Sequence, residues 1–255
     1  MIRVFSGAGR AAVSIGFLMA VVAIAPCWGQ SAGGAWGDDE DGHSRLMAMA
    51  DFNRDGIADI AEVVQPTDGS GNGILRVSLG QASGGFRLVS SSAVLGRASR
   101  AIVTGDFNED GVPDVIIGDD DGALKLFLGD GSGNLVSAGD IAQLDSVVSI
   151  AVADFDGDGR ADLAVSDWRG GSVTIFLGAG KGTFRRGWSF HLRMPATVAR
   201  VSAADFNGDG IPDLAVIYGD EDDVTFDVML GDGKGVFVHS PQLSWTRDPN
   251  SHCPA

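Results

Sequence analysis

The chain has 255 residues, of which 34 are acidic and 18 are basic, and its formal net charge is -16. The basic residues are scattered singly, which excludes the clustered positive charge that nucleic-acid phosphates require, so we expect no nucleic-acid partner. The 38 glycines and the low aromatic content are typical of short strands joined by many turns. Two cysteines are too few for a disulfide-dense scaffold.

Residues 1–29 are typical of a secretory signal peptide. Arg3 and Arg10 precede an apolar run over residues 11–25, and small residues follow this run. The run is too short to span a membrane. The sequence therefore predicts a secreted, periplasmic or extracellular protein with no transmembrane segment.

The cleavage point decides what happens to the first cysteine. Cleavage after Gly29 is favoured, because cleavage after Ala25 leaves Pro26 as the first residue. A lipid anchor on Cys27 is a further alternative, although a proline precedes it. If Cys27 is retained, a disulfide with Cys253 would tie the two ends of the chain together.

The mature chain consists of four repeats between two short segments. Residues 30–44 are rich in glycine and acidic residues without periodicity and are predicted to be a flexible lead-in. Residues 244–255 form a C-terminal tail. Between them the chain repeats with a period of about 50 residues, which indicates a propeller or solenoid. The repeats span about 45–92, 98–143, 147–192 and 197–243.

Each repeat contains the acidic pattern D-F-[ND]-x-D-G-x-x-D, here called the acidic loop. Carboxylates this close repel one another, and no basic partner is expected within the loops, so the pattern favours a hard cation with oxygen ligands, such as calcium. Side chains at positions 1, 3, 5 and 9 and the backbone carbonyl at position 7 are the predicted ligands of up to four Ca²⁺ ions. These are Asp51, Asn53, Asp55, Ile57 and Asp59; Asp106, Asn108, Asp110, Val112 and Asp114; Asp154, Asp156, Asp158, Arg160 and Asp162; and Asp205, Asn207, Asp209, Ile211 and Asp213.

Two other interpretations of the acidic loops are less consistent with the sequence. Asp/Asn-rich turns that bond only their own backbone need no ion, but they do not require aspartate at positions 1, 5 and 9 in every copy. An EF-hand requires a glutamate at position 12 and flanking helices. Only the first copy has that glutamate, Glu62, and Pro113 and Pro212 disfavour an exiting helix in two others. We therefore expect strands on both sides of each loop.

A second signature follows each acidic loop: an apolar strand ending in Leu-Gly, a glycine-rich turn and a large apolar residue. It occurs over residues 77–86, 126–135, 175–184 and 228–237, and it predicts a β-hairpin. In the third repeat the expected strands are 147–153, 162–166, 172–177 and 183–191. The predicted fold is all-β: a β-propeller-like array of four four-stranded antiparallel blades.

With these two signatures, residues 45–243 resemble the FG-GAP and VCBS repeats of integrin-alpha-type β-propellers and of secreted bacterial proteins. The resemblance implies that the acidic loop between the first two strands of each blade binds calcium. Propellers of the integrin type have seven blades, whereas this sequence supplies four. Closure of four blades into a ring is favoured, because an open arc leaves bare edges and apolar faces; an open arc would complete a ring by self-association.

In such a meander the acidic loops and hairpins share one edge, and variable loops share the other. The variable loops are residues 65–73, 118–122, 167–171 and 219–223. Recognition usually resides in loops that differ on a regular scaffold, and Trp168 with Arg169 is the candidate ligand contact. The alternative is that Trp168 only covers the rim of the core. The acidic runs 119–121 and 220–223 are interpreted as solvated loop charge; binding of a basic surface or of further calcium is the alternative.

The function favoured by these features is a secreted, calcium-stabilised binding or adhesion module for an extracellular protein or glycan. The alternative is a carbohydrate-active hydrolase or lyase, or its accessory lectin domain. The sequence offers no catalytic constellation, and we expect no enzyme activity. The histidines stand in no nucleophile or zinc motif: His43, His191, His239 and His252.

Overall fold

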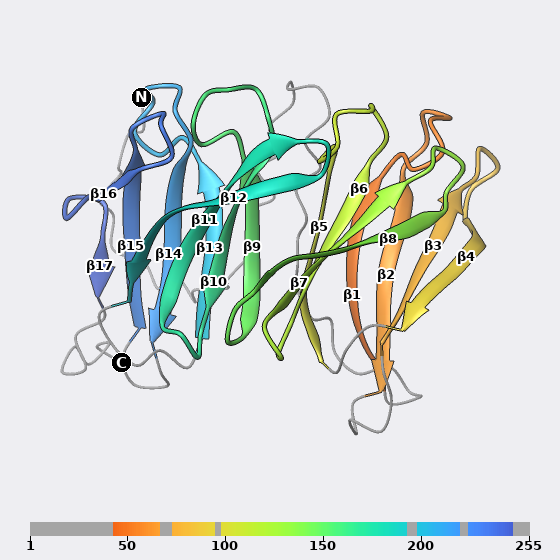
Figure 1. Ribbon diagram of the computed structural model, residues 1–255, viewed down its shortest axis with the longest axis horizontal. Coiled ribbons are helices and arrows are strands. Elements are labelled where there is room, and N and C mark those ends of the chain that lie inside the picture. Colours follow the sequence, from red (N-terminus) through yellow and green to blue (C-terminus); the bar gives the residue numbers. More distant parts are fainter. Residues whose placement is uncertain (1–42, 67–72, 95–97, 193–197, 220–223, 247–255) are drawn as a thin grey trace, which may run out of the picture.

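The computed structural model describes residues 43–66, 73–94, 98–192, 198–219 and 224–246. The predicted signal peptide, most of the lead-in and the tail beyond Thr246 lie outside these residues. Every regular element described is a β-strand, and the strands form four antiparallel sheets, each from consecutive strands (Figure 1). The predicted all-β array of four-stranded blades is confirmed.

The sheets follow the order of the repeats. The first contains β1 (His43–Ala50), β2 (Asp59–Pro66), β3 (Ile74–Gly80) and β4 (Phe86–Val94). The second contains β5 (Ser99–Gly105), β6 (Asp114–Asp119), β7 (Ala123–Gly129) and β8 (Leu135–Gln143). The third contains β9 (Val147–Ala153), β10 (Asp162–Asp167), β11 (Ser172–Gly180) and β12 (Thr183–His191). The fourth contains β13 (Val198–Ala204), β14 (Asp213–Gly219), β15 (Val224–Gly231) and β16 (Phe237–His239), and β17 (Trp245–Thr246) also pairs with β15.

The acidic loops connect the first and second strands of each sheet, as expected. The second strands β2, β6, β10 and β14 all begin at the position-9 aspartate. Glu62 lies within β2, paired with Met47 of β1, and no helix flanks a loop in the described chain. The position-12 glutamate is therefore a residue of a strand, and the EF-hand interpretation is excluded.

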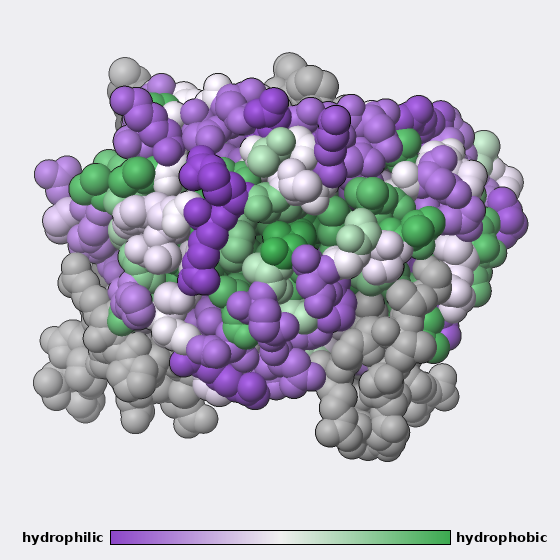
Figure 2. All heavy atoms as spheres, viewed as in Figure 1, coloured by the Kyte–Doolittle hydropathy of each residue, from purple (hydrophilic) through white to green (hydrophobic). Residues whose placement is uncertain are grey.

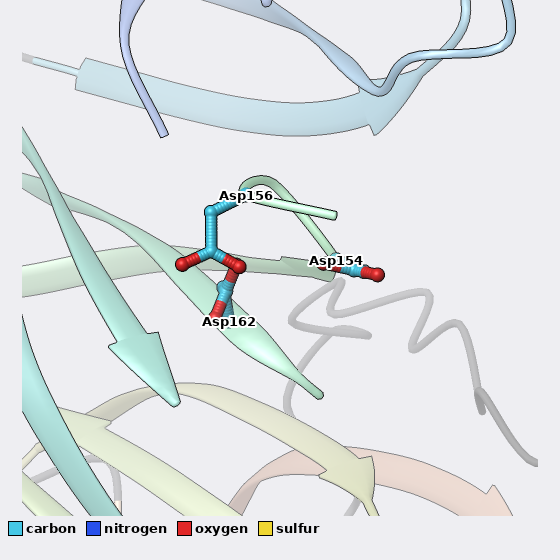
Figure 3. A group of neighbouring side chains, drawn as sticks. All are labelled: Asp154, Asp156 and Asp162. Carbon is cyan, nitrogen blue, oxygen red and sulfur yellow. The ribbon is translucent and has the colours of Figure 1, made fainter. Parts of the chain in front are cut away.

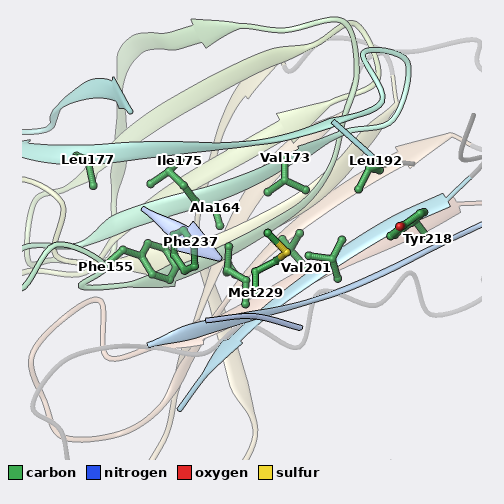
Figure 4. Close-up of a cluster of buried hydrophobic side chains, with 13 residues drawn as sticks. Phe155, Ala164, Val173, Ile175, Leu177, Leu192, Val201, Tyr218, Met229 and Phe237 are labelled. Carbon is green, nitrogen blue, oxygen red and sulfur yellow. The ribbon is translucent and has the colours of Figure 1, made fainter. Parts of the chain in front are cut away.

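Each pair of neighbouring sheets encloses one apolar core. The first core joins Leu46 and Leu75 to Ile117 and Phe127, and the second core lies between the second and third sheets. Figure 4 shows the third core, in a row between the third and fourth sheets, with Phe155, Ile175, Val201, Met229 and Phe237 among its members. The inner sheets use both of their faces, so β6 and β10 are buried along their whole length.

The four sheets form an open array, and the expectation of a closed ring was wrong. β1 packs along β5, β5 along β9, and β9 along β13, whereas no comparable packing joins β1 to β13 among the strands described. The first and last sheets lie at opposite ends of the long axis (Figure 1). The cores explain this, because the third is filled from Val201 on β13 to Phe237 on β16. Side chains that fill the space between two sheets from the first strand to the last keep the sheets nearly parallel. A ring of four blades instead needs a rotation of about 90° between neighbouring sheets.

The two long edges of the array differ in content. The acidic loops and the hairpins lie along the upper edge in Figure 1, and this edge is hydrophilic in the space-filling view (Figure 2). Apolar residues gather in the middle of the same view, over the second and third sheets (Figure 2). The described residues include no helix that is long and apolar enough to cross a membrane.

Candidate metal centre

The position-9 aspartate of each acidic loop is completely buried and joins the loop to the hairpin. In the third blade, Asp162 Oδ2 accepts the N–H of Phe155 at 2.8 Å and Oδ1 accepts the N–H of Gly178 at 2.7 Å. The same pair of bonds recurs in the other blades. The donors are Phe52 and Gly80 to Asp59, Phe107 and Gly129 to Asp114, and Phe206 and Gly231 to Asp213. Each hairpin is therefore fixed to the acidic loop of its own blade.

This joint also explains the glycine of the Leu-Gly pair. A Cβ on Gly178 would lie 2.5 Å from the carbonyl oxygen of Ala161, and one on Gly129 would lie 2.3 Å from that of Pro113. No side chain fits at that separation, so the glycine is needed for close approach. The sequence pattern predicts this glycine only as the end of the apolar strand before the turn. The signal was its occurrence once per repeat at the end of the third strand.

The position-1 aspartate closes the acidic loop on itself. Asp154 Oδ1 accepts the N–H of Gly157 at 2.7 Å, and its Oδ2 accepts the N–H of Gly159 at 2.8 Å. Gly159 has a φ of +86°, which side chains rarely adopt. The glycines at position 6 of the other loops have similar values, as predicted for the sharp turn: Gly56, Gly111 and Gly210.

Position 3 determines how the carboxylates are grouped. In the third loop it is an aspartate, and one carboxylate oxygen from each of Asp154, Asp156 and Asp162 lies within 4.8 Å of the others. Figure 3 shows the carboxylates of Asp156 and Asp162 turned toward one another. In the other loops position 3 is asparagine, whose amide donates to the position-5 carboxylate, as from Asn53 to Asp55 at 2.9 Å. The carboxylate and amide oxygens of these loops are the ligand atoms that a hard cation prefers. The residues therefore fit calcium.

Burial and like charge perturb the acids of the second and third loops. Burial raises the pKa of Asp114 and of Asp162 to about 6, against hydrogen bonds from backbone N–H groups that lower it. Burial also raises the pKa of Asp156, and the neighbouring Asp158 carboxylate adds to that rise. In the fourth loop the exposed Asp205 has a lowered pKa, because the N–H groups of the loop donate to it. The third loop therefore holds its carboxylates together against an electrostatic cost.

In the third loop position 7 is an arginine, Arg160, whose side chain pairs with a carboxylate of the same loop. The expectation that the acidic loops contain no basic partner was therefore wrong there. The side chain of Arg160 bonds Asp158 within its own loop at 2.8 Å and Glu109 of the second loop at 2.6 Å. Arg54 of the first loop donates to the carbonyl oxygen of Asp110 at 2.7 Å. These basic side chains neutralise part of the charge and link successive loops along the edge. The carbonyl ligands predicted at position 7 stay a prediction.

Trp168 and Arg169 adjoin one another on the opposite edge. The Arg169 guanidinium carbon lies 5.8 Å from the centre of the Trp168 ring, and Arg169 pairs with Asp120 at 3.2 Å. The backbone N–H of Trp168 donates to the carbonyl oxygen of Ser146 at 3.3 Å. Both residues thus belong to the joint between the second and third blades, and their role as ligand contacts stays a prediction.

The acidic run next to this joint is not simply solvated charge, which corrects that interpretation for its first member. Asp119 is buried, accepts the N–H of Ala123 at 2.9 Å and pairs with Lys125 at 3.3 Å. Asp120 accepts the Ser146 hydroxyl at 3.0 Å. The second run, 220–223, lies outside the described residues.

The comparisons with known proteins agree with this repeat architecture. The pattern of the FG-GAP-like repeat matches residues 51–117, 106–165 and 164–216. A T-cell immunomodulatory protein homolog of Plasmodium yoelii yoelii is 27% identical over 175 residues, which cover 58% of this chain. The matched segment covers 25% of that relative, so this chain corresponds to about a quarter of its length.

Two solved structures match this chain at low identity and with low TM-scores. The Bacillus licheniformis rhamnogalacturonan lyase PL11 is 18% identical with a TM-score of 0.46, covering 84% of this chain and 45% of the lyase. The exotype rhamnogalacturonan lyase YesX is 16% identical with a TM-score of 0.28, covering 86% and 36% of the two chains. At these levels the two structures say nothing about activity.

Proposed function

Because the chain belongs to the family of FG-GAP-like repeat proteins, we propose that it is a secreted binding module whose acidic loops each hold a calcium ion. The grouping of Asp154, Asp156 and Asp162 within 4.8 Å supports this proposal most directly. A divalent cation there offsets the repulsion between the carboxylates. It also favours the ionised form of Asp162, whose pKa is otherwise raised by burial.

Calcium acts on the blade through the position-9 aspartate. Both oxygens of Asp162 already accept backbone N–H groups, one from the acidic loop and one from the start of the hairpin. A cation bound to the same carboxylate fixes the loop, the second strand and the hairpin together. The ion is a structural clamp in this proposal, and the chain's own residues supply every contact to a partner.

The partner is an extracellular protein or a glycan, bound at the edge opposite the acidic loops. The acidic-loop edge repeats the same contacts in every blade, whereas the opposite edge differs from blade to blade. The stacked Trp168 and Arg169 are the aromatic and cationic groups of that edge, a pairing that suits sugars and protein anchors alike. Catalysis is not proposed, because no observation on the described residues favours it.

Calcium titration of the purified chain tests the metal part of the proposal. We expect the wild-type protein to bind up to four ions and the Asp158→Ala variant to bind one fewer, with a lower melting temperature. Asp121→Ala is the matched control, because Asp121 is exposed and lies outside the acidic loops. No heat of binding, together with a melting curve unchanged by chelator, would refute the calcium sites.

A glycan array and a pull-down from extracellular matrix test the recognition part. We expect binding to at least one defined ligand, reduced about tenfold or more by Trp168→Ala, with Val136→Ala as the control on an exposed site of β8. Turnover of pooled polysaccharides by the purified protein would instead establish the carbohydrate-active enzyme.

A further inference from the structure

Every interface between blades contains the same apolar contact at the acidic-loop edge. The position-2 phenylalanine of one blade packs against the large apolar residue that follows the hairpin of the next blade. The ring centres of Phe107 and Phe184 lie 5.9 Å apart, and those of Phe155 and Phe237 lie 5.4 Å apart. At the first interface Phe52 and Leu135 are buried in the same core. We call this contact the phenylalanine joint.

Backbone hydrogen bonds accompany the phenylalanine joint. Gly182, in the hairpin of the third blade, donates to the carbonyl oxygen of Phe107 at 2.9 Å. Gly235, in the hairpin of the fourth blade, donates to that of Phe155 at 2.9 Å. The hairpins of the third and fourth blades therefore cover the acidic loop of the blade before them.

The two ends of the array each expose one half of this joint. Phe206, the position-2 residue of the last blade, is 40% exposed, whereas Phe155 is fully buried. Phe86, which follows the hairpin of the first blade, is 53% exposed, whereas Phe237 is 3% exposed. The last blade thus exposes the acidic-loop phenylalanine, Phe206, that the hairpin of a following blade would cover. The first blade exposes Phe86, which lies where it could cover the acidic loop of a preceding blade.

The outer faces of the end sheets also carry exposed apolar side chains. Ile217 on β14 is 45% exposed, although Val63 at the same place in the first blade is fully buried against the second sheet. On the first sheet, Met49 of β1 is 53% exposed and Ile74 of β3 is 37% exposed. These side chains stand on opposite terminal faces of one array.

We propose that the chain associates head to tail with a second copy, with its last sheet stacked on the first sheet of that copy. Phe206 of one copy packs against Phe86 of the other and completes the phenylalanine joint. The interface is continuous in kind with the three interfaces inside the chain. Such a heterologous contact forms a ring of two copies if the rotation closes, and an open filament if it does not. The contact is made by side chains of the end blades and does not involve a ligand at the opposite edge.

Sedimentation of the purified chain over a range of concentrations tests this association. We expect species heavier than the monomer in the wild type. Phe206→Asp and Phe86→Arg, tested singly, are each expected to weaken association at least tenfold, because each places a charge in an apolar contact. Val136→Asp is the matched control, since Val136 is 61% exposed on β8, away from both end faces, and is expected to leave association unchanged.

The double variant Phe86→Arg/Phe206→Asp separates a specific contact from general loss of hydrophobic surface. It places opposite charges across the same contact and is expected to associate more strongly than either single variant. Both positions are exposed in the single chain, so the melting temperature of the monomer stays close to that of the wild type. A wild type that is monomeric at every concentration would overturn the proposal, as would association that survives both single variants.

Discussion

At the scale of single residues, the position-9 aspartates join the acidic loop to the hairpin and are also proposed to bind calcium. Asp114 and Asp162 are buried, and each uses both oxygens to accept backbone N–H groups from two different loops. Fourfold repetition in the sequence predicts them as calcium ligands, and this role is part of the proposed function. Their bonds to the hairpin were not predictable, because the partner glycine lies in the hairpin, separated by a strand and a loop of variable length.

The raised pKa values of Asp114 and Asp162 predict how stability depends on pH without calcium. Their folded-state pKa of about 6 lies above the unfolded value of about 3.9, so their contribution is fully present below pH 3.9 and is lost as the pH rises through 6. In chelator, we expect a higher melting temperature at pH 5 than at pH 7.5, because each group contributes about 1.4 kcal/mol more to the free energy of unfolding at pH 5.

Calcium reverses the order in this experiment. Protons and calcium compete for the same carboxylates, so in excess calcium the melting temperature is expected to be higher at pH 7.5 than at pH 5. Thermal unfolding at both pH values, with and without chelator, checks both signs. A chelated protein that melts higher at pH 7.5 contradicts the effect attributed to these two groups.

At the scale of elements, strands were predictable and their exact joints were not. The expected strand at 147–153 coincides with β9, and the expected strand at 183–191 coincides with β12. Both have apolar or alternating patterns with turn residues at each end. The packing of each hairpin on the preceding acidic loop depends on contacts between repeats, which no single repeat encodes.

The Leu-Gly glycine provides a test at this scale. A Cβ at residue 178 would meet the backbone oxygen of Ala161 at 2.5 Å, and backbone cannot move aside as a side chain can. We expect Gly178→Ala to destabilise the protein by about 2–3 kcal/mol in chemical denaturation. Gly187→Ala is the matched control in the same blade, where the nearest atom would lie 3.4 Å away, and it is expected to change stability by less than about 1 kcal/mol. Equal losses from both variants would contradict the close approach.

At the scale of the whole molecule, the number of blades could be read from the sequence and their closure could not. The repeats specify four sheets and the order in which they stack. The angle between sheets depends on the summed side-chain volumes across three cores, including residues such as Val201 and Phe237 at opposite ends of one core. The motifs near the loops do not specify these summed side-chain volumes, so they do not predict whether the array closes.

The open array also makes the four acidic loops unequal, which gives a last prediction. The side chains of Asp110 and Asp209 make the same hydrogen bonds: each accepts the N–H of position 7 and the amide of the position-3 asparagine. The second loop, however, supports Phe107 beneath the next hairpin, whereas the fourth supports Phe206, which is 40% exposed. Loosening the second loop therefore disturbs an interface between blades, and loosening the fourth disturbs an end of the array.

We expect Asp110→Ala to lower the melting temperature more than Asp209→Ala, by several degrees, in calcium and at concentrations where the protein is monomeric. Calorimetry of the two variants measures the difference directly, and the two proteins lose the same charge and the same kinds of hydrogen bond. Equal losses would mean that each loop stabilises only its own blade. A larger loss for the interior loop means that the acidic-loop edge stabilises the stacking of one sheet on the next.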